Sequence, residues 1–227
     1  MVGPSGCGKT TLLYLLAGLR RPSRGEIRVQ GELLTSPRPA TGLILQDYGL
    51  LPWATAWDNV ALGLKIRGMN RAEMRRRVEE WMVRLGIFEL RHKYPAALSG
   101  GQRQRVAIAR TLTLEPDLLL MDEPFSSLDA FTREDLQGLA VSLLDEGDRA
   151  SVLVTHDVQE AVFIGRRILA LGKPPTRSAV VMKNPYAHRP EYRGSGPFWE
   201  MCGRVKAAVA SAVNGGAALP VTVGAER

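Results

Sequence analysis

Cysteine is scarce in this chain of 227 residues, which contains Cys7 and Cys202. Two cysteines so far apart in sequence do not make a disulfide framework. Long apolar runs are absent as well, and no stretch approaches the ~18–20 consecutive apolar residues that cross a bilayer. No basic segment followed by an apolar one stands near the start, so a signal peptide is not expected. These absences predict a cytosolic protein.

Acidic residues are also outnumbered, with 23 Asp and Glu against 30 Lys and Arg and a formal net charge of +7. Such an excess suits nucleic acid, nucleotides or an anionic membrane surface as a partner. The basic residues do not, however, form one patch interleaved with aromatic residues. Residues 75–77 are three arginines that lie in sequence beside Glu73, Glu79 and Glu80, as on a solvated helix face. The charge alone therefore selects no partner.

A pattern that binds nucleotide phosphates begins at the third residue. Residues 3–10 read GPSGCGKT and match G-x-x-x-x-G-K-[ST] without a mismatch. Glycine lacks a Cβ, so this backbone can turn tightly enough to point several N–H groups into one concavity. The apolar run at 10–17 predicts a helix, buried on most sides, whose N-terminus would face the phosphates. A glycine-rich turn before a core helix is the plain alternative.

Each residue of this loop has an expected place around the triphosphate of ATP. Lys9 would contact the β- and γ-phosphates, and the hydroxyl of Thr10 would bind Mg²⁺. The residues predicted to surround the triphosphate are Gly3, Pro4, Ser5, Gly6, Cys7, Gly8, Lys9, Thr10 and Thr11.

The rest of the chain alternates between strand and helix patterns. Short apolar or alternating runs predict strands at 25–34, 41–45, 117–121, 151–154, 167–171 and 178–182. Amphipathic or apolar segments predict helices at 70–85 (capped by Asn70), at 102–114 and after Asp157. This alternation indicates a three-layer α/β core, which a helical subdomain at about 57–112 would interrupt. Residues 214–227 lack periodicity and are expected to form a loose tail.

Two carboxylates end the most apolar of these runs, residues 118–123 with the sequence LLLMDE. Ligands bind at the carboxyl edge of a doubly wound sheet. Asp122 would hold the hydration shell of Mg²⁺, and Glu123 would polarise the water that attacks the γ-phosphate. Carboxylates commonly end strands, so this interpretation depends on the phosphate loop upstream.

Five motifs occur in order along the chain: GPSGCGKT at 3–10, LSGGQ at 98–102, MDEP at 121–124, SSLD at 126–129 and THD at 155–157. Together they resemble the nucleotide-binding subunit of ATP-binding-cassette (ABC) transporters over roughly the first 185 residues. The LSGGQ motif is the most specific, because other phosphate-loop ATPases lack it. The resemblance implies a P-loop NTPase core with an ABC-type helical subdomain, in one ATPase domain at 1–213.

The resemblance also implies that the site is shared between two copies of the chain. Ser99 and Gly101 would bind the γ-phosphate held by the second copy, so that two ATP molecules are enclosed in a head-to-tail dimer. A helix that starts Ser-Gly-Gly is an anion-binding terminus, although an ordinary N-cap at Ser99 is the plain alternative. The residues assigned to this motif are Ser99, Gly100, Gly101 and Gln102.

Three further roles follow from the resemblance alone. Asp129 would link the two sites across the dimer. His156 would contact the γ-phosphate and position the attacking water. Gln46 would reach Mg²⁺ and the γ-phosphate at the junction with the helical subdomain. With these roles, the expected catalytic residues are Glu123, His156 and Lys9, and the expected Mg²⁺ ligands are Thr10, Gln46 and Asp122.

A narrower resemblance concerns residues 51–62, LPWATAWDNVAL, and the later 189–190 and 197–199. These segments are similar to those of importers of nitrate, sulfonates, taurine and bicarbonate. The similarity implies a peripheral ATPase at the cytoplasmic face of the cell membrane that drives import of a small anionic solute. Its partners would be two membrane permease subunits and, indirectly, a solute-binding protein, which select the solute. Residues 47–53 would be either subdomain core or a groove for a helix of the membrane partner.

Two other functions stay open at this point. An ABC ATPase that acts on nucleic acid or ribosomes would suit the basic charge. Such relatives carry long coiled coils or two cassettes, and the stretch between Gln46 and Leu98 is too short for a coiled-coil arm, so no nucleic-acid partner is expected. The other alternative is a truncated cassette, because only Met1 and Val2 precede the loop where relatives have a strand and an adenine-stacking aromatic residue. That alternative predicts weak ATP binding, little or no ATPase activity and aggregation.

Overall fold

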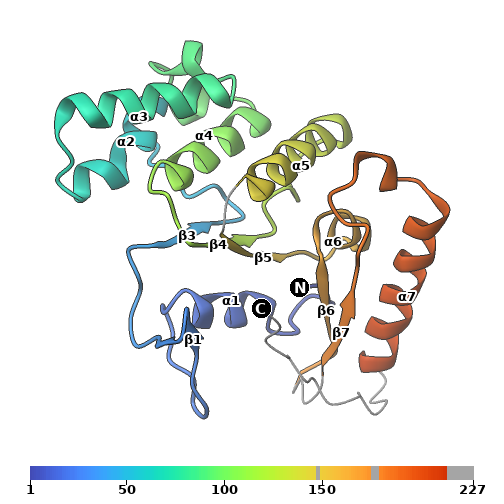
Figure 1. Ribbon diagram of the computed structural model, residues 1–227. Helices are drawn as coiled ribbons and strands as arrows, with labels where there is room; N and C mark the ends of the chain where they lie inside the picture. Colours follow the sequence, from blue (N-terminus) through green and yellow to red (C-terminus); the bar gives the residue numbers. More distant parts are fainter. Residues whose placement is uncertain (147–148, 175–178, 214–227) are drawn as a thin grey trace. The chain divides into compact units, whose positions relative to one another are not determined.

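The computed structural model describes residues 1–146, 149–174 and 179–213 (Figure 1). The chain forms two compact units. The central unit is Leu16–Val152, and the terminal unit combines Met1–Leu15 with Leu153–Arg227. The expected tail at 214–227 lies outside the described residues.

The sheet of the central unit is built around its most apolar strand. β4 (Leu118–Asp122) is buried at all five positions, as a strand covered on both faces requires. It pairs in parallel with β3 (Thr41–Ile44), with Thr41 opposite Leu118 and Ile44 opposite Met121. β5 (Ala150–Val154) follows on its other side in the strand order β3-β4-β5. The strands expected at 41–45, 117–121 and 151–154 are thus confirmed.

The expected extended stretch at 25–34 is wrong. The chain instead folds back on itself as an antiparallel hairpin of β1 (Arg28–Val29) and β2 (Glu32–Leu33). Gln30 and Gly31 form the turn with φ values of 51° and 82°. Two successive left-handed residues match the twist of a tight hairpin, and glycine adopts this conformation without strain.

Helices α2 (Ala56–Ile66), α3 (Arg71–Arg84) and α4 (Gly100–Leu112) pack against one another in the central unit, as Figure 1 shows in cyan and green. α3 confirms the helix expected at 70–85. Asn70 caps it by accepting a hydrogen bond from the N–H of Glu73 at 2.9 Å. Gly86, with φ 65°, follows its end, where a left-handed glycine commonly terminates a helix.

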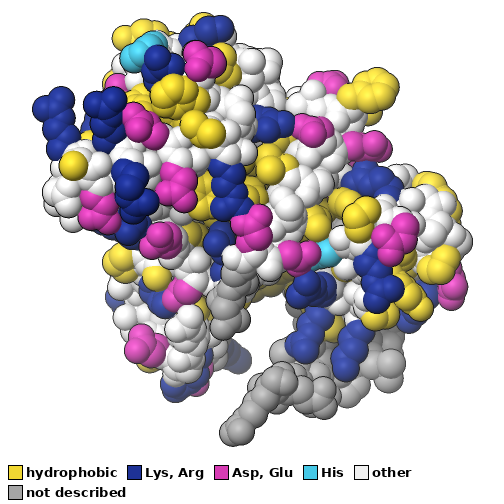
Figure 2. Space-filling view, turned by 45° about the horizontal axis from the view of Figure 1, so that its top comes forward, with side chains coloured by type: hydrophobic (Ala, Val, Ile, Leu, Met, Phe, Trp, Pro, Cys, Tyr) yellow, Lys and Arg dark blue, Asp and Glu magenta, His cyan; other side chains and the backbone are white. Residues whose placement is uncertain are grey.

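The charged face of α3 confirms the solvated surface expected from its sequence. Arg75 and Glu79 approach to 2.8 Å, and Arg76 and Glu80 to 3.3 Å, one helical turn apart, with both arginines exposed. The third arginine, Arg77, is largely covered, at 23% exposed. Lys, Arg, Asp and Glu side chains are also intermingled over the face of the molecule in Figure 2. The excess of positive charge is therefore not gathered in one patch on this face.

Two helices were not expected from the sequence. α5 (Ala130–Asp145) lies in the central unit and is capped by Asp129. α7 (Gly196–Val213) lies in the terminal unit and buries Phe198, Met201, Cys202 and Val205. Single-turn 3-10 helices occur at Phe88–Leu90 (η1), Pro95–Ala97 (η2) and Pro190–Tyr192 (η3).

The terminal unit holds the remaining elements, which are α1 (Lys9–Leu16), α6 (Val158–Ile164), β6 (Arg167–Leu171) and β7 (Ala179–Lys183). β6 and β7 confirm the strands expected at 167–171 and 178–182, although residue 178 lies outside the described residues, and they pair antiparallel. α1 confirms the helix expected after the phosphate loop. It is less buried than expected, because only Lys9 and Leu13 are fully covered.

Candidate functional site

The phosphate loop is a closed turn that ends where α1 begins. Gly6 and Gly8 have φ values of 77° and 96°, a region that residues with a Cβ rarely adopt. A Cβ on Gly3 would lie 2.7 Å from the carbonyl oxygen of Leu171, so glycine is required there for a steric reason. Lys9 is buried, and its ammonium donates to the carbonyls of Gly3 at 2.9 Å and Pro4 at 3.0 Å. The loop therefore holds a positive charge at the N-terminus of a helix.

The loop is anchored by the residue in front of it. Val2 is fully buried and forms parallel bridges with both Thr155 and Ala170. Its N–H donates to the carbonyl of Leu169 at 2.9 Å, and its carbonyl accepts from the N–H of Leu171 at 2.8 Å. The backbone that leads into the phosphate loop thus lies between the residue after β5 and strand β6.

His156 directly follows Thr155 and is exposed. Its neighbours fix the backbone on both sides. The hydroxyl of Thr155 accepts from the N–H of Asp157 at 2.9 Å, and Asp157 caps α6 by accepting from the N–H of Gln159 at 2.8 Å. The helix expected after Asp157 is confirmed. Within the terminal unit, the structure places His156 on a segment that pairs with the backbone entering the phosphate loop.

The carboxylates of the central unit follow its buried strand. Asp122 ends β4 and is 6% exposed. Glu123 has φ 45°, a left-handed conformation that costs energy for a residue with a side chain and is found mostly at functional sites. The carbonyl of Glu123 accepts from the hydroxyl of Ser126 at 3.0 Å and from its N–H at 3.2 Å. This turn holds the backbone of Glu123 in its strained conformation.

The LSGGQ segment forms the N-terminus of α4, two residues earlier than expected. Ser99 caps the helix: its hydroxyl accepts from the N–H of Gln102 at 3.3 Å, and the Gln102 side chain accepts from the N–H of Ser99 at 3.0 Å. The structure thus confirms that Ser99 is the N-cap of α4, which was the alternative to phosphate binding. Because Ser99 is exposed, this role leaves the helix N-terminus accessible to an anion.

The start of α5 packs directly against this segment. A Cβ on Gly101 would lie 2.5 Å from Cγ2 of Thr132, and one on Gly100 would lie 3.2 Å from Cδ2 of Leu128. Asp129 caps α5 through the N–H of Thr132 at 3.0 Å, and hydrogen bonds from Thr132 lower the pKa of its carboxyl. The structure therefore brings Gly100, Gly101 and Asp129 together within the central unit. Gln46, also in this unit, lies exposed just after β3.

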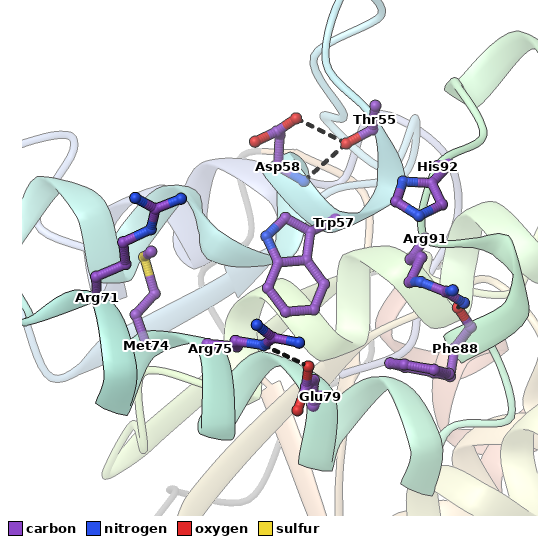
Figure 3. Close-up of a pocket in the computed structure, with 10 residues that line it drawn as sticks. All are labelled: Thr55, Trp57, Asp58, Arg71, Met74, Arg75, Glu79, Phe88, Arg91 and His92. Atoms are coloured by element: carbon purple, nitrogen blue, oxygen red, sulfur yellow. Dashed lines mark hydrogen bonds and ion pairs between the residues drawn. The ribbon is translucent and has the colours of Figure 1, made fainter.

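A separate pocket of about 570 Å³ lies among α2, α3 and η1 (Figure 3). Its apolar part consists of Trp57, Met74 and Phe88. Charged and polar side chains surround them: Thr55, Asp58, Arg71, Arg75, Glu79, Arg91 and His92. Sequence reasoning missed this pocket, because its residues are spread over 55–92 and meet only in the fold.

The polar edge of this pocket is fixed by local contacts. Thr55 donates its hydroxyl to Asp58 at 2.7 Å, and hydrogen bonds from Lys65 and Thr55 lower the pKa of the Asp58 carboxyl. The Arg91 guanidinium lies 4.4 Å from the centre of the Phe88 ring. An amphipathic pocket of this size suits either a small molecule or side chains of a partner helix.

Within the described ranges, no helix is long and apolar enough to cross a membrane. The described residues also contain no cluster of three or more His, Cys, Asp or Glu side chains that could hold a metal ion.

A glycine-rich phosphate loop before a helix, together with a buried strand that ends in Asp-Glu, defines a P-loop ATPase. Residues 1–126 match the family described as ABC transporter. The chain is 43% identical over 189 residues to the taurine import ATP-binding protein TauB of Pseudomonas aeruginosa, covering 83% of this chain and 72% of that protein. The Escherichia coli K12 protein of the same name is 43% identical over 177 residues, 78% of this chain and 69% of that protein. The chain belongs to the ABC transporter family, whose ATP-binding proteins are ATPases.

Solved structures agree with this assignment. CbiO1 from Clostridium perfringens, part of the ABC transporter complex cbiONQ, matches with a TM-score of 0.71 and 28% identity over 82% of this chain and 76% of that chain. The ATP-binding cassette MJ0796, in a dimeric post-hydrolysis state bound to ADP and Pi, matches with a TM-score of 0.65 and 34% identity over 74% of this chain and 78% of that chain. The expected P-loop α/β fold is confirmed, whereas the domain limits and the roles of individual site residues stay predictions.

Proposed function

We propose that this chain is the ATP-binding and hydrolysing subunit of an import system for a small anionic solute. The observation that carries the proposal is the LSGGQ segment: it caps α4 with Gly100 and Gly101 packed against the start of α5, beside Asp129. The N-terminus of α4 can therefore bind an anion. No phosphate loop adjoins it in sequence, so we expect that anion to be held by another phosphate loop. The taurine import proteins named above support import rather than export, and a sulfonate is the solute class that they suggest.

Each residue of the proposed ATP site has its own role in binding or hydrolysis. Lys9 would contact the β- and γ-phosphates, since its ammonium is already held within the loop. Glu123 would accept a proton from the attacking water, and His156 would orient that water against the γ-phosphate. Thr10, Gln46 and Asp122 would hold Mg²⁺: hydroxyl, amide and carboxylate oxygens are the hard ligands it prefers. When bound, Mg²⁺ neutralises phosphate charge that develops during transfer.

A second copy of the chain would complete each site. Ser99 and Gly101 would face the γ-phosphate bound to the other copy, and Asp129 would lie where the two sites meet. The dimeric state of MJ0796 supports this arrangement. ATP binding would close the dimer and hydrolysis would reopen it.

The membrane subunits would bind the central unit. Trp53 is 75% exposed and lies in the segment 47–53, and the pocket around Trp57 and Phe88 follows it directly in sequence. An exposed aromatic residue next to an amphipathic pocket fits an inserted helix of a membrane protein. We therefore place the chain peripherally at the cytoplasmic face of the membrane, with two permease subunits and, through them, a solute-binding protein.

Co-purification from its own cells tests this proposal. A tagged full chain is expected to retain integral membrane proteins, and Trp53→Ala is expected to weaken that association without lowering ATP binding. Ile66→Ala is the matched control, because Ile66 is also exposed, at 77%, but lies outside the pocket residues. Stable association with RNA and no membrane partner would contradict the importer and favour the nucleic-acid alternative.

A further inference from the structure

Tyr48 has a backbone conformation that is unusual for a residue with a large side chain. Its φ is 67°, and that of the following Gly49 is 56°. A non-glycine residue persists in this region only when its surroundings over-determine it. Two hydrogen bonds from Arg110 do so: one nitrogen of its guanidinium donates to the carbonyl of Tyr48 at 2.8 Å, and the other to that of Gly49 at 2.6 Å.

The side chain of Tyr48 is held as firmly as its backbone. It is 8% exposed, and its hydroxyl lies 2.6 Å from the hydroxyl of Ser127. The Arg103 guanidinium lies 5.5 Å from the centre of its ring. A Cβ on Gly100 would lie 3.4 Å from the Tyr48 hydroxyl. Tyr48 therefore contacts two parts of the chain that are distant in sequence, α4 and the segment around Ser127, both within the central unit.

Each of these segments carries a residue of the proposed ATP site. Tyr48 itself follows Gln46 by two residues, and Ser127 precedes Asp129 by two and follows Glu123 by four. Gly100 belongs to the LSGGQ segment. The hydrogen bond between Tyr48 and Ser127 spans 79 residues of sequence and is a direct side-chain link between the segment after Gln46 and the one that ends at Asp129.

We propose that Tyr48 is a positioning residue for ATP hydrolysis: its hydroxyl ties the segment after Gln46 to the segment between Glu123 and Asp129, so that the two segments move together. The expected effect of Tyr48 on ATP turnover rests on the proposed function. The hydrogen bond that links the two segments exists whether or not the chain hydrolyses ATP. Phenylalanine would fill the same space and keep the contact with Arg103. The hydroxyl, bonded to Ser127, is thus the group that makes the link.

Tyr48→Phe, Ser127→Ala and the double variant of the full chain test the link directly. Hydrogen–deuterium exchange without nucleotide is expected to rise at 126–129 in Tyr48→Phe and at 47–51 in Ser127→Ala, each across the broken bond. With Mg-ATP, kcat is expected to fall roughly three- to tenfold, which corresponds to one hydrogen bond. KM for ATP should stay within about twofold, and the double variant should match the single ones, since all three lose the same bond.

Tyr94→Phe is the matched control, because it removes the same hydroxyl from an exposed tyrosine of the same unit. It should leave both measurements unchanged. Unchanged exchange across the bond would overturn the link, and so would effects on kcat that add in the double variant. A lower melting temperature with unchanged kcat would reduce Tyr48 to a structural role. If the wild-type chain fails to hydrolyse ATP, the proposed function fails, while the exchange experiment still decides whether the link exists.

Discussion

Asn59 and Leu51 exchange two hydrogen bonds: the N–H of Leu51 donates to Asn59 Oδ1 at 2.8 Å, and Asn59 Nδ2 donates to the carbonyl of Leu51 at 3.1 Å. The same Nδ2 also reaches the carbonyls of Ala54 at 3.1 Å and Thr55 at 3.0 Å. Asn59 is fully buried. One amide on α2 therefore shapes the loop that exposes Trp53 and leads into the pocket.

Replacing this amide should be costly. Asn59→Leu keeps the volume of the side chain but leaves the buried polar groups of the loop without their partner. We expect the free energy of unfolding to fall by about 3 kcal/mol, as measured by urea denaturation. Asn70→Ala is the control, because it removes an exposed helix cap and should cost only about 1 kcal/mol. Equal losses in the two variants would contradict the role given to Asn59.

The ion pair between Arg38 and Asp117 predicts a pH dependence of stability. Its two hydrogen bonds are 2.9 and 2.7 Å long, and the side chains are 21% and 24% exposed. The hydrogen bond from Arg38 lowers the pKa of Asp117. The stabilisation is therefore complete above the unfolded pKa of about 3.9 and is lost as the pH falls through the lower folded value.

Asp117→Asn should accordingly reduce the free energy of unfolding by about 1 kcal/mol at pH 7. The difference from wild type should shrink below about pH 4, because protonation of Asp117 then removes from the wild-type pair the charge that the asparagine variant lacks at every pH. Glu79→Gln, which breaks the exposed pair with Arg75, should change the free energy of unfolding much less, because solvent screens that pair. A difference that is constant from pH 7 to pH 3 would contradict this assignment.

Two glycines in the central unit should respond to alanine in opposite directions. Gly138 lies within α5 and has open space where a Cβ would stand, so Gly138→Ala should stabilise the chain by roughly 0.5–1 kcal/mol. Gly101→Ala would place its Cβ 2.5 Å from Thr132 and should destabilise by roughly 1–3 kcal/mol. Thermal unfolding of both variants checks this, and the same sign for both would be inconsistent with the packing described.

Gln104 is a fully buried amide of α4 whose nitrogen and oxygen have no hydrogen-bond partner among the described residues. It lines a cavity with Ile108, Met121 and Phe125. Unsatisfied buried polar atoms cost about 1–3 kcal/mol. Gln104→Met, of similar length and apolar, should therefore raise the free energy of unfolding by about 1 kcal/mol. A clear loss of stability in urea would show instead that the amide has a partner.

Local patterns predicted those parts of the fold that local forces determine. The apolar run of β4 is continuous in sequence, and the caps Asn70 and Asp157 bond residues only two or three positions away. The sequence alone therefore predicts all three. α5 was missed because Gly138 and the 88% exposed Phe131 interrupt its apolar pattern. The turn at Gln30 and Gly31 is hidden in the sequence, since the flanking residues alternate through it and predict a continuous strand.

The features of the candidate site likewise differ in whether a local sequence pattern predicts them. Ser99 and Gly101 could be located from a motif, because a helix N-terminus is a local structure. The pocket around Trp57 and the contact between Tyr48 and Ser127 could not, because they join residues far apart in sequence. The role proposed for His156 would depend on bound ATP, and that proposed for Asp129 on a second copy of the chain, neither of which is part of the structure of one chain.

The central claim is tested most directly by the rate of phosphate release from Mg-ATP in the wild-type chain and in Glu123→Gln. The account predicts steady hydrolysis by the wild type and none by Glu123→Gln, because glutamine cannot accept the proton of the attacking water. The variant should still dimerise when ATP is added, as sedimentation would show. Hydrolysis at the wild-type rate in Glu123→Gln would contradict the account.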